Sequence, residues 1–133
     1  VGSEMCIRDR LVVAHGSRSP RANEEVARLA GILADRFGKD FGRVDYAYLE
    51  IAEPKIAAAV ATLAADGVTR IKVLPFFLAG GTHVAKDIPA CIAAAQTEFP
   101  TIRFEILPHL GALDGIPELI LRHINNVAGT DRG

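Results

Sequence analysis

The chain lacks the features that mark membrane proteins and nucleic-acid-binding proteins. Its 133 residues contain no apolar run long enough to span a bilayer, so we expect no membrane segment. Its net charge is −1, and it has no stripe of basic residues of the kind that binds nucleic acid. Its two cysteines lie far apart and form no ligand pair, and Cys91 is expected to be a small core residue. These absences favour a cytoplasmic protein.

The first ten residues differ from the rest of the chain. Residues 1–10 have no clear hydrophobic period and mix charges, and they contain no apolar segment typical of a signal peptide. We therefore expect a leader that is foreign to the fold, the alternative being a short native arm. The domain is expected to cover residues 11–128, and residues 129–133 are expected to form a loose tail.

Strand and helix patterns alternate along the remaining chain. Half of the residues are hydrophobic, which is enough for the core of one domain. Short apolar runs predict strands, and apolar residues three and four apart predict helices, the second of them with Pro54 in its first turn. The predicted strands are 11–14, 44–49, 70–77 and 102–107, and the predicted helices are 20–37, 53–65, 87–98 and 116–127.

This alternation predicts an α/β fold with βαβ units and a parallel sheet. Right-handed crossovers restrict the topology, and we expect a single small doubly wound domain with four parallel strands flanked by helices. The expected strand order is 2-1-3-4, as in flavodoxin-like folds. A sheet this small leaves one flank exposed, which favours self-association.

Histidines follow two of the predicted strands. His15 comes directly after the first strand, and His83 follows the third strand after the link Gly80-Gly81-Thr82. Glu50 follows the second strand, and His109 follows the fourth. Ligands bind at the carboxyl edge of open parallel sheets, so these side chains are expected to converge there.

The converging side chains suit a divalent metal. Two imidazoles and a carboxylate are ligands for Co²⁺, Fe²⁺, Ni²⁺ or Zn²⁺, and three protein ligands would leave positions open for reaction. Gly80 and Gly81 would let the backbone approach a flat or bulky ligand. Free N–H groups are expected at the helix starts near Ser17 and Thr82. The positive side chains nearby are Arg18, Arg21 and Lys86, so the expected ligand is anionic and meets a metal.

Several of these residues have ordinary alternatives. His15 and His83 can be turn or helix-start residues, but their pairing favours a function. Glu50 is equally well a solvated residue at a strand end, and Arg18 equally well a solvated residue at a helix start. Residues expected to be structural or peripheral are Glu53 in the first helical turn, His109 at the rim of the pocket and His123 in the last helix.

The residues at these strand ends resemble one known family. The segments that carry the resemblance are Leu11-Val-Val-Ala-His-Gly-Ser-Arg18, Ala47-Tyr-Leu-Glu50 with Glu53-Pro54, and Pro75-Phe-Phe-Leu-Ala-Gly-Gly-Thr-His83 with Asp87-Ile-Pro89. In this order they are similar to the small CbiX/SirB-type class II chelatases, the sirohydrochlorin cobaltochelatases and ferrochelatases. The similarity extends from about Leu11 to Ile124, and it implies that the fold is half of a two-domain chelatase.

The resemblance implies a reaction and a set of roles. The reaction is insertion of a divalent metal, Co²⁺ with Fe²⁺ or Ni²⁺ as alternatives, into sirohydrochlorin for cobalamin or siroheme synthesis. His15, His83 and Glu50 would handle both the metal and the protons, without an organic cofactor. The tetrapyrrole would lie between the subunits of a homodimer. Its carboxylates and ring would contact Ser17, Arg18, Gly80, Gly81, Thr82 and Lys86.

Rival functions have weaker support in the sequence. A non-catalytic carrier of metal or tetrapyrrole would use the same histidines, so it stays an alternative. A receiver-type signalling domain needs acidic residues after the first strand, where His15 stands, and a histidine phosphatase needs arginine where Ala14 stands. The chain has no P-loop, no GxGxxG and no GxSxG, so nucleotide binding and serine hydrolysis have no motif support.

Overall fold

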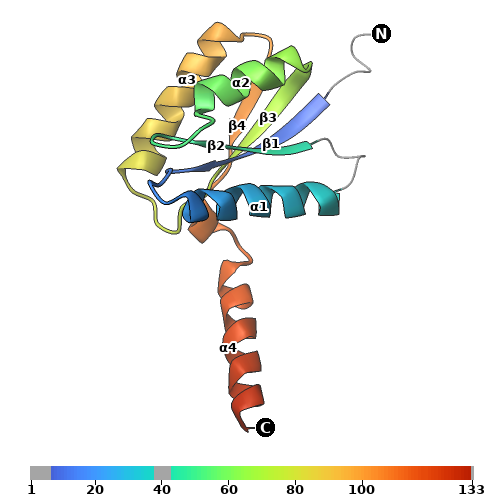
Figure 1. The fold of residues 1–133 in the computed structure, drawn as a ribbon, viewed down its shortest axis with the longest axis vertical. Coiled ribbons are helices and arrows are strands. Elements are labelled where there is room, and N and C mark those ends of the chain that lie inside the picture. The colour runs from blue at the N-terminus through green and yellow to red at the C-terminus, as the bar shows by residue number, and fades with distance from the viewer. Residues whose placement is uncertain (1–6, 38–42, 133) are drawn as a thin grey trace.

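The computed structural model describes residues 7–37 and 43–132, with the environment of side chains described as far as residue 126. Strands and helices alternate as the sequence predicts (Figure 1). Their bounds are β1 Ile7–Ala14, α1 Pro20–Phe37, β2 Arg43–Tyr48, α2 Ile56–Ala65, β3 Val68–Pro75, the π-helical turn η3 His83–Asp87, α3 Ile88–Glu98, β4 Arg103–Ile106, the 3-10 turn η4 Leu110–Ala112 and α4 Ile116–Arg132.

The four strands form one parallel sheet in the order β2-β1-β3-β4, which confirms the predicted topology. Strand β1 lies between β2 and β3, with Val13 opposite Ala47 on one side and Pro75 on the other. The segments after β1, β2 and β3 therefore meet at the same carboxyl edge.

Helices cover the two faces of the sheet unequally (Figure 1). Successive residues of a strand point to opposite faces, so β1 supplies both layers of the core. Leu11 and Val13 pack with residues of α2 and α3, including Val60 and Ile92. Val12 packs with Ala30 of α1 on the other face. Both faces of the carboxyl half of β1 are thus buried, which explains why its sequence is continuously apolar.

Strand β1 begins earlier than the sequence predicts. It starts at Ile7 rather than Leu11, and its residue Asp9 pairs with Arg43 of β2 and Ile71 of β3. The last four residues of the expected leader therefore belong to the sheet, which corrects that boundary, while residues 1–6 lie outside the described residues. The charged residues 8–10 interrupt the apolar run from which the strand was predicted.

The second helix begins later than predicted, at Ile56. Pro54 lies before this helix. Its carbonyl accepts a hydrogen bond of 2.8 Å from the Tyr48 N–H, which keeps it beside the end of β2. Lys55 forms an isolated parallel bridge with Tyr48. Residues 53–55 thus lie beside the end of β2 and do not form the expected first helical turn.

The last helix, α4, is longer than predicted and projects away from the rest of the molecule (Figure 1). It continues to Arg132, so residues 129–132 are helical instead of forming the expected loose tail. Large apolar side chains of α4 are exposed: Leu119 46%, Ile120 51%, Leu121 55% and Ile124 56%. Among the described helices, none is both long and apolar enough to cross a membrane.

Candidate functional site

The carboxyl edge of the sheet brings His15, Glu50 and His83 together. Backbone hydrogen bonds continue past the strand ends: the Leu49 N–H donates to the Ala14 carbonyl over 2.9 Å, and the Glu50 N–H donates to the His15 carbonyl over 3.1 Å. Glu50 is thereby aligned beside His15. The parallel arrangement of the strands accounts for this proximity.

The two histidine rings lie in direct contact. The ring centroids of His15 and His83 are 4.6 Å apart, and the ring planes meet at 62° in an edge-to-face arrangement. The side chains are 36% and 44% exposed, respectively. The pair therefore forms an open site that a large ligand can approach from solvent.

Both ring nitrogens of His15 have partners. Its Nδ1 lies 3.0 Å from the Gly16 carbonyl oxygen, and its Nε2 lies 2.8 Å from a carboxylate oxygen of Glu50. Because a carbonyl oxygen only accepts hydrogen bonds, the proton of the first contact belongs to Nδ1. The Glu50 carboxylate likewise only accepts, so both contacts are made together when each nitrogen of His15 carries a proton, and Nε2 becomes open to a metal or a proton once the contact with Glu50 is released.

Two unusual backbone conformations fix the position of Glu50. Gly16 has φ +99°, and a Cβ at this residue would lie only 1.9 Å from the Glu50 carbonyl oxygen, so the close approach requires glycine. Ile51 has φ 73°, and the Ala52 N–H donates to the Glu50 carbonyl over 2.8 Å. This i to i+2 bond around a positive φ is a strained γ-turn. Strain of this kind is typical of functional loops.

His83 is held by a carboxylate that the sequence analysis did not single out as a functional residue. Its Nδ1 lies 2.6 Å from Oδ2 of Asp87. The ring of Phe77 lies roughly parallel to the His83 ring, with centroids 6.2 Å apart and an angle of 30°. The spacing of four residues between His83 and Asp87 was the available signal. Pro89 obscured this signal, because proline is typical of the first turn of a helix and therefore predicts no helical turn at residues 83–87.

The described residues contain no group of three His, Cys, Asp or Glu side chains arranged to hold a metal ion. The predicted set of His15, His83 and Glu50 is close together but is not assembled as a ligand set. The physical reason is that the Glu50 carboxylate is hydrogen-bonded to Nε2 of His15. A metal held by these groups would need the Glu50 carboxylate to turn away from the imidazole.

Two backbone N–H groups before α1, those of Ser17 and Ser19, already have hydrogen-bond partners. The Ser17 N–H donates to Oδ1 of Asn23 over 2.9 Å, and the Ser19 N–H donates to Oγ of Ser17 over 3.0 Å. The side-chain amide of Asn23 also donates to the Ser17 carbonyl over 2.8 Å. These N–H groups are therefore occupied, and Asn23 is a residue of this loop that the sequence analysis missed.

The loop that contains Ser17 is anchored to the core through Tyr48. The Tyr48 hydroxyl donates to the Asn23 carbonyl over 2.6 Å, and burial raises the pKa of this phenol. Tyr48 is only 2% exposed, so this anchor is buried. The start of α1 is thus fixed to the end of β2, beside the segment that carries Glu50.

The other predicted contacts follow the same strands as the two histidines and are exposed residues. Arg18 and Lys86 are exposed, as are Gly80 and Gly81. Thr82 is the residue before η3 and makes no side-chain capping hydrogen bond. The peripheral residues are also placed: Glu53 pairs with Lys55 over 2.7 Å, which lowers the pKa of Glu53, His109 lies against Gly80, and His123 is exposed on α4.

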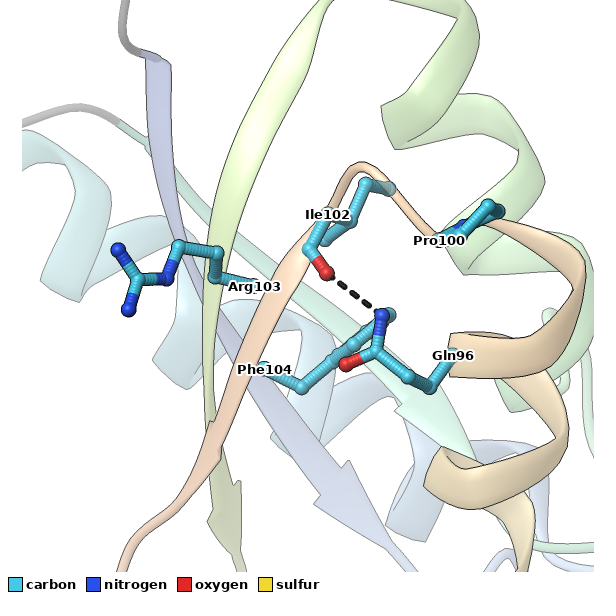
Figure 2. A pocket seen from close by; sticks show the side chains of 5 residues that line it. All are labelled: Gln96, Pro100, Ile102, Arg103 and Phe104. Atoms are coloured by element: carbon cyan, nitrogen blue, oxygen red, sulfur yellow. Dashed lines mark hydrogen bonds between the residues drawn. The ribbon is translucent and has the colours of Figure 1, made fainter.

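A concave surface lies away from the histidines, beside β4 (Figure 2). It is lined by Gln96, Pro100, Ile102, Arg103 and Phe104, and the Gln96 side-chain amide donates to the Ile102 carbonyl over 2.8 Å. Ile102 precedes β4, so this surface belongs to the amino edge of the sheet. It contains no histidine or carboxylate, and the chemistry at the carboxyl edge has no part in it.

Comparison with known proteins identifies the family of the chain. The family model described as CbiX matches residues 10–127. A sirohydrochlorin cobaltochelatase from Methanosarcina acetivorans is 36% identical over 83 residues, which are 62% of this chain and 62% of that protein. A chloroplastic sirohydrochlorin ferrochelatase from Arabidopsis thaliana is 32% identical over 123 residues, which are 90% of this chain and 54% of that protein.

A solved structure shows the same fold. The sirohydrochlorin chelatase SirB from Bacillus subtilis subspecies spizizenii, in complex with cobalt, matches with a TM-score of 0.77 and 26% identity over 92% of this chain and 51% of that chain. The chain thus spans between 51% and 62% of the length of these three relatives. The family model covers nearly the whole chain, and the chain therefore belongs to the CbiX family.

Proposed function

We propose that this chain is a sirohydrochlorin chelatase that inserts a divalent metal into the tetrapyrrole. The observation that supports it most strongly is the contact of His15 and His83, 4.6 Å between centroids, with Glu50 bonded to His15 at the same open edge. Imidazoles and a carboxylate are groups that both bind such metals and accept protons. The relatives named as cobaltochelatase and ferrochelatase support the same reaction.

The reaction requires proton acceptors as well as metal ligands. Insertion of M²⁺ breaks two pyrrole N–H bonds and releases two protons, while four nitrogens of the macrocycle take the metal. A neutral imidazole can accept one proton, and a carboxylate can relay another. We assign His15 and His83 to metal and proton transfer, and Glu50 to the metal or to the proton relay.

A loosely held metal suits this reaction, in which the metal is a substrate. A closed cage of four ligands would oppose transfer to the macrocycle, whereas an incomplete set leaves positions open for it. The Glu50 contact with His15 supports this assignment, since the carboxylate can move between the imidazole and an arriving metal. Co²⁺ is the preferred candidate, and Fe²⁺ and Ni²⁺ are alternatives because the same ligands accept them.

The tetrapyrrole is proposed to bind over the histidine pair, with its carboxylates near positive side chains. Arg18 and Lys86 are exposed, and each follows one of the two histidines in the sequence, Arg18 after β1 and Lys86 within η3. Gly80 and Gly81 provide backbone without side chains, next to Thr82. The N–H groups of Ser17 and Ser19 are excluded as anion donors because side-chain oxygens already accept from them.

A second copy of the chain is the proposed partner. The site is open, and the chain matches about half of SirB, so another copy is well suited to close over the macrocycle. The apolar side chains Leu119, Ile120 and Ile124 of α4 are about half exposed and support the same proposal. Large exposed apolar surfaces are typical of interfaces. We place the homodimer in the cytoplasm.

Anaerobic absorption spectroscopy tests the function directly. Purified protein is mixed with sirohydrochlorin and Co²⁺, Fe²⁺ or Ni²⁺, one metal at a time, against the rate without protein. A chelatase is expected to give many turnovers per protein molecule and to rank the metals. Tight binding of the metal or tetrapyrrole with no metallated product above background would contradict it and favour a carrier.

A further inference from the structure

The contact between His83 and Asp87 lies within an uncommon turn. Residues His83–Asp87 form a π-helical turn, and the Ile88 N–H donates to the His83 carbonyl five residues earlier. Such turns are rare and occur frequently at functional sites. The turn brings the Asp87 carboxylate to 2.6 Å from Nδ1 of His83, a length typical of a strong, charge-assisted hydrogen bond.

Asp87 does not act as an ordinary helix cap. It precedes α3, but its backbone is helical and its side chain makes no capping hydrogen bond. The hydrogen bond that its carboxylate makes is with His83. A carboxylate only accepts hydrogen bonds, so the proton of this contact belongs to Nδ1.

The surroundings of the ring leave one nitrogen open. Phe77 lies along one face of the His83 ring, and His15 meets the ring edge to face. Within the described part of the chain, Nε2 of His83 has no hydrogen-bond partner. This differs from His15, whose two nitrogens are occupied by Gly16 and Glu50.

We propose that Asp87 is a positioning residue, which holds His83 with its proton on Nδ1 and presents the unprotonated Nε2 to the substrate. The effect of Asp87 on catalysis rests on the proposed chelatase function, whereas its effect on the tautomer of His83 does not. A carboxylate behind a ligating histidine fixes the tautomer and orientation of the ring. His83 is then the histidine ready to accept a pyrrole proton or the metal, and His15 acts together with Glu50.

Asp87→Asn separates the positioning role from a structural one. Asparagine keeps the size of the side chain and suits a helix start, but its amide can donate to Nδ1 and move the proton to Nε2. Nitrogen-15 spectra of the four histidine rings at pH about 8, above the ordinary imidazole pKa of about 6.5, report the tautomer of His83 without any substrate. His83→Ala identifies its signals, and Glu98→Gln removes a carboxylate from the far end of α3 as a control.

The expected result has two parts. In the wild type and in Glu98→Gln, Nδ1 of His83 carries the proton, whereas in Asp87→Asn a large share moves to Nε2. The value of kcat falls roughly tenfold to hundredfold in Asp87→Asn while KM for the tetrapyrrole changes less than about threefold and the melting temperature is retained.

Two results would overturn the proposal. The first is a His83 tautomer that stays unchanged in Asp87→Asn. The second is a fall in kcat that occurs in both Asp87→Asn and Asp87→Ala and that follows the fall in melting temperature of each variant, as a purely structural role would predict. If the wild type itself turns over no substrate, the chelatase function fails, while the ring spectra still decide the role of Asp87.

Discussion

The imidazole rings of His15 and His83 meet edge to face with their centroids 4.6 Å apart. They come from segments distant in the sequence, and neighbouring strands β1 and β3 bring them together. The two rings differ in what surrounds them: a glutamate and a backbone carbonyl bind His15, and an aspartate binds His83. This asymmetry gives the two histidines different tasks in the proposed reaction.

Removing the charge of Glu50 is expected to slow metal insertion. Glu50→Gln keeps the side-chain length but loses the carboxylate that faces Nε2 of His15, so we expect turnover to fall roughly a hundredfold, within the usual range for a proton-transfer group. The measurement is the initial rate of metallation under anaerobic conditions. Glu53→Gln is the matched control, because Glu53 pairs with Lys55 instead. Equal rates in the two variants would remove Glu50 from the mechanism.

A side chain at Gly16 is expected to displace Glu50 and destabilise the fold. In Gly16→Ala the new Cβ would lie 1.9 Å from the Glu50 carbonyl oxygen at a φ of +99°, so we expect a loss of about 1–3 kcal/mol or more in the free energy of unfolding, with lower turnover. Urea denaturation measures it.

Gly31 offers the opposite case. It is exposed within helix α1 and a Cβ there would contact nothing within 4 Å, so Gly31→Ala should stabilise by about 0.5–1 kcal/mol. A Gly16→Ala variant that is as stable as Gly31→Ala would contradict the close approach of Gly16 to the Glu50 carbonyl.

The buried carboxyl group of Asp9 is expected to make stability depend on pH. Its side chain is fully buried in the sheet, neither of its oxygens has a hydrogen-bond partner, and burial together with the nearby Asp45 raises its pKa to about 9. The pKa in the unfolded chain is about 3.9. A raised pKa in the folded state favours the protonated form, so the contribution of Asp9 to stability should be greatest below pH about 4 and should fall as the pH rises toward 9.

Asp9→Asn isolates this effect, because it removes the titrating group and keeps the shape. Its free energy of unfolding relative to wild type should increase from pH 5 to pH 9, as measured by urea denaturation at several pH values. Parallel pH curves for the two proteins would mean that Asp9 is ionised in the folded protein or is exposed.

Helix α4 is expected to carry the contact between two copies of the chain. Ile120→Glu places a charge among the exposed apolar residues Leu119 and Ile124, and it should shift a dimer toward monomer in sedimentation velocity experiments. Asn125→Glu adds the same charge on the opposite, polar side of α4 and should leave the mass unchanged. A dimer that survives Ile120→Glu would place the interface elsewhere.

Much of the fold could be predicted because its elements follow simple periodicities. The fully apolar run Leu11–Ala14 predicted a central strand, and the stripe through Val26, Ala30 and Leu33 predicted α1 with the bounds found in the structure. The strand order and the convergence of His15 with His83 then follow from parallel pairing. These features are determined by local pattern and by the geometry of the parallel sheet.

The rest depended on contacts that no local pattern contains. Asp9 is charged yet buried, so β1 extends beyond its apolar run. Pro54 suits a helix start, but backbone hydrogen bonding to Tyr48 keeps it beside β2. The link of Asp87 to His83 lies within a π-helical turn, and sequence periodicity does not indicate such a turn.

The most direct test of the account is the rate of Co²⁺ insertion into sirohydrochlorin by His15→Ala and His83→Ala, measured anaerobically beside the wild type and Glu53→Gln. We predict multiple turnovers for the wild type and for Glu53→Gln, and a loss of about a hundredfold or more in each histidine variant, since both rings contact each other at the site. Turnover that survives both histidine substitutions would contradict the account and place the active site elsewhere in the chain.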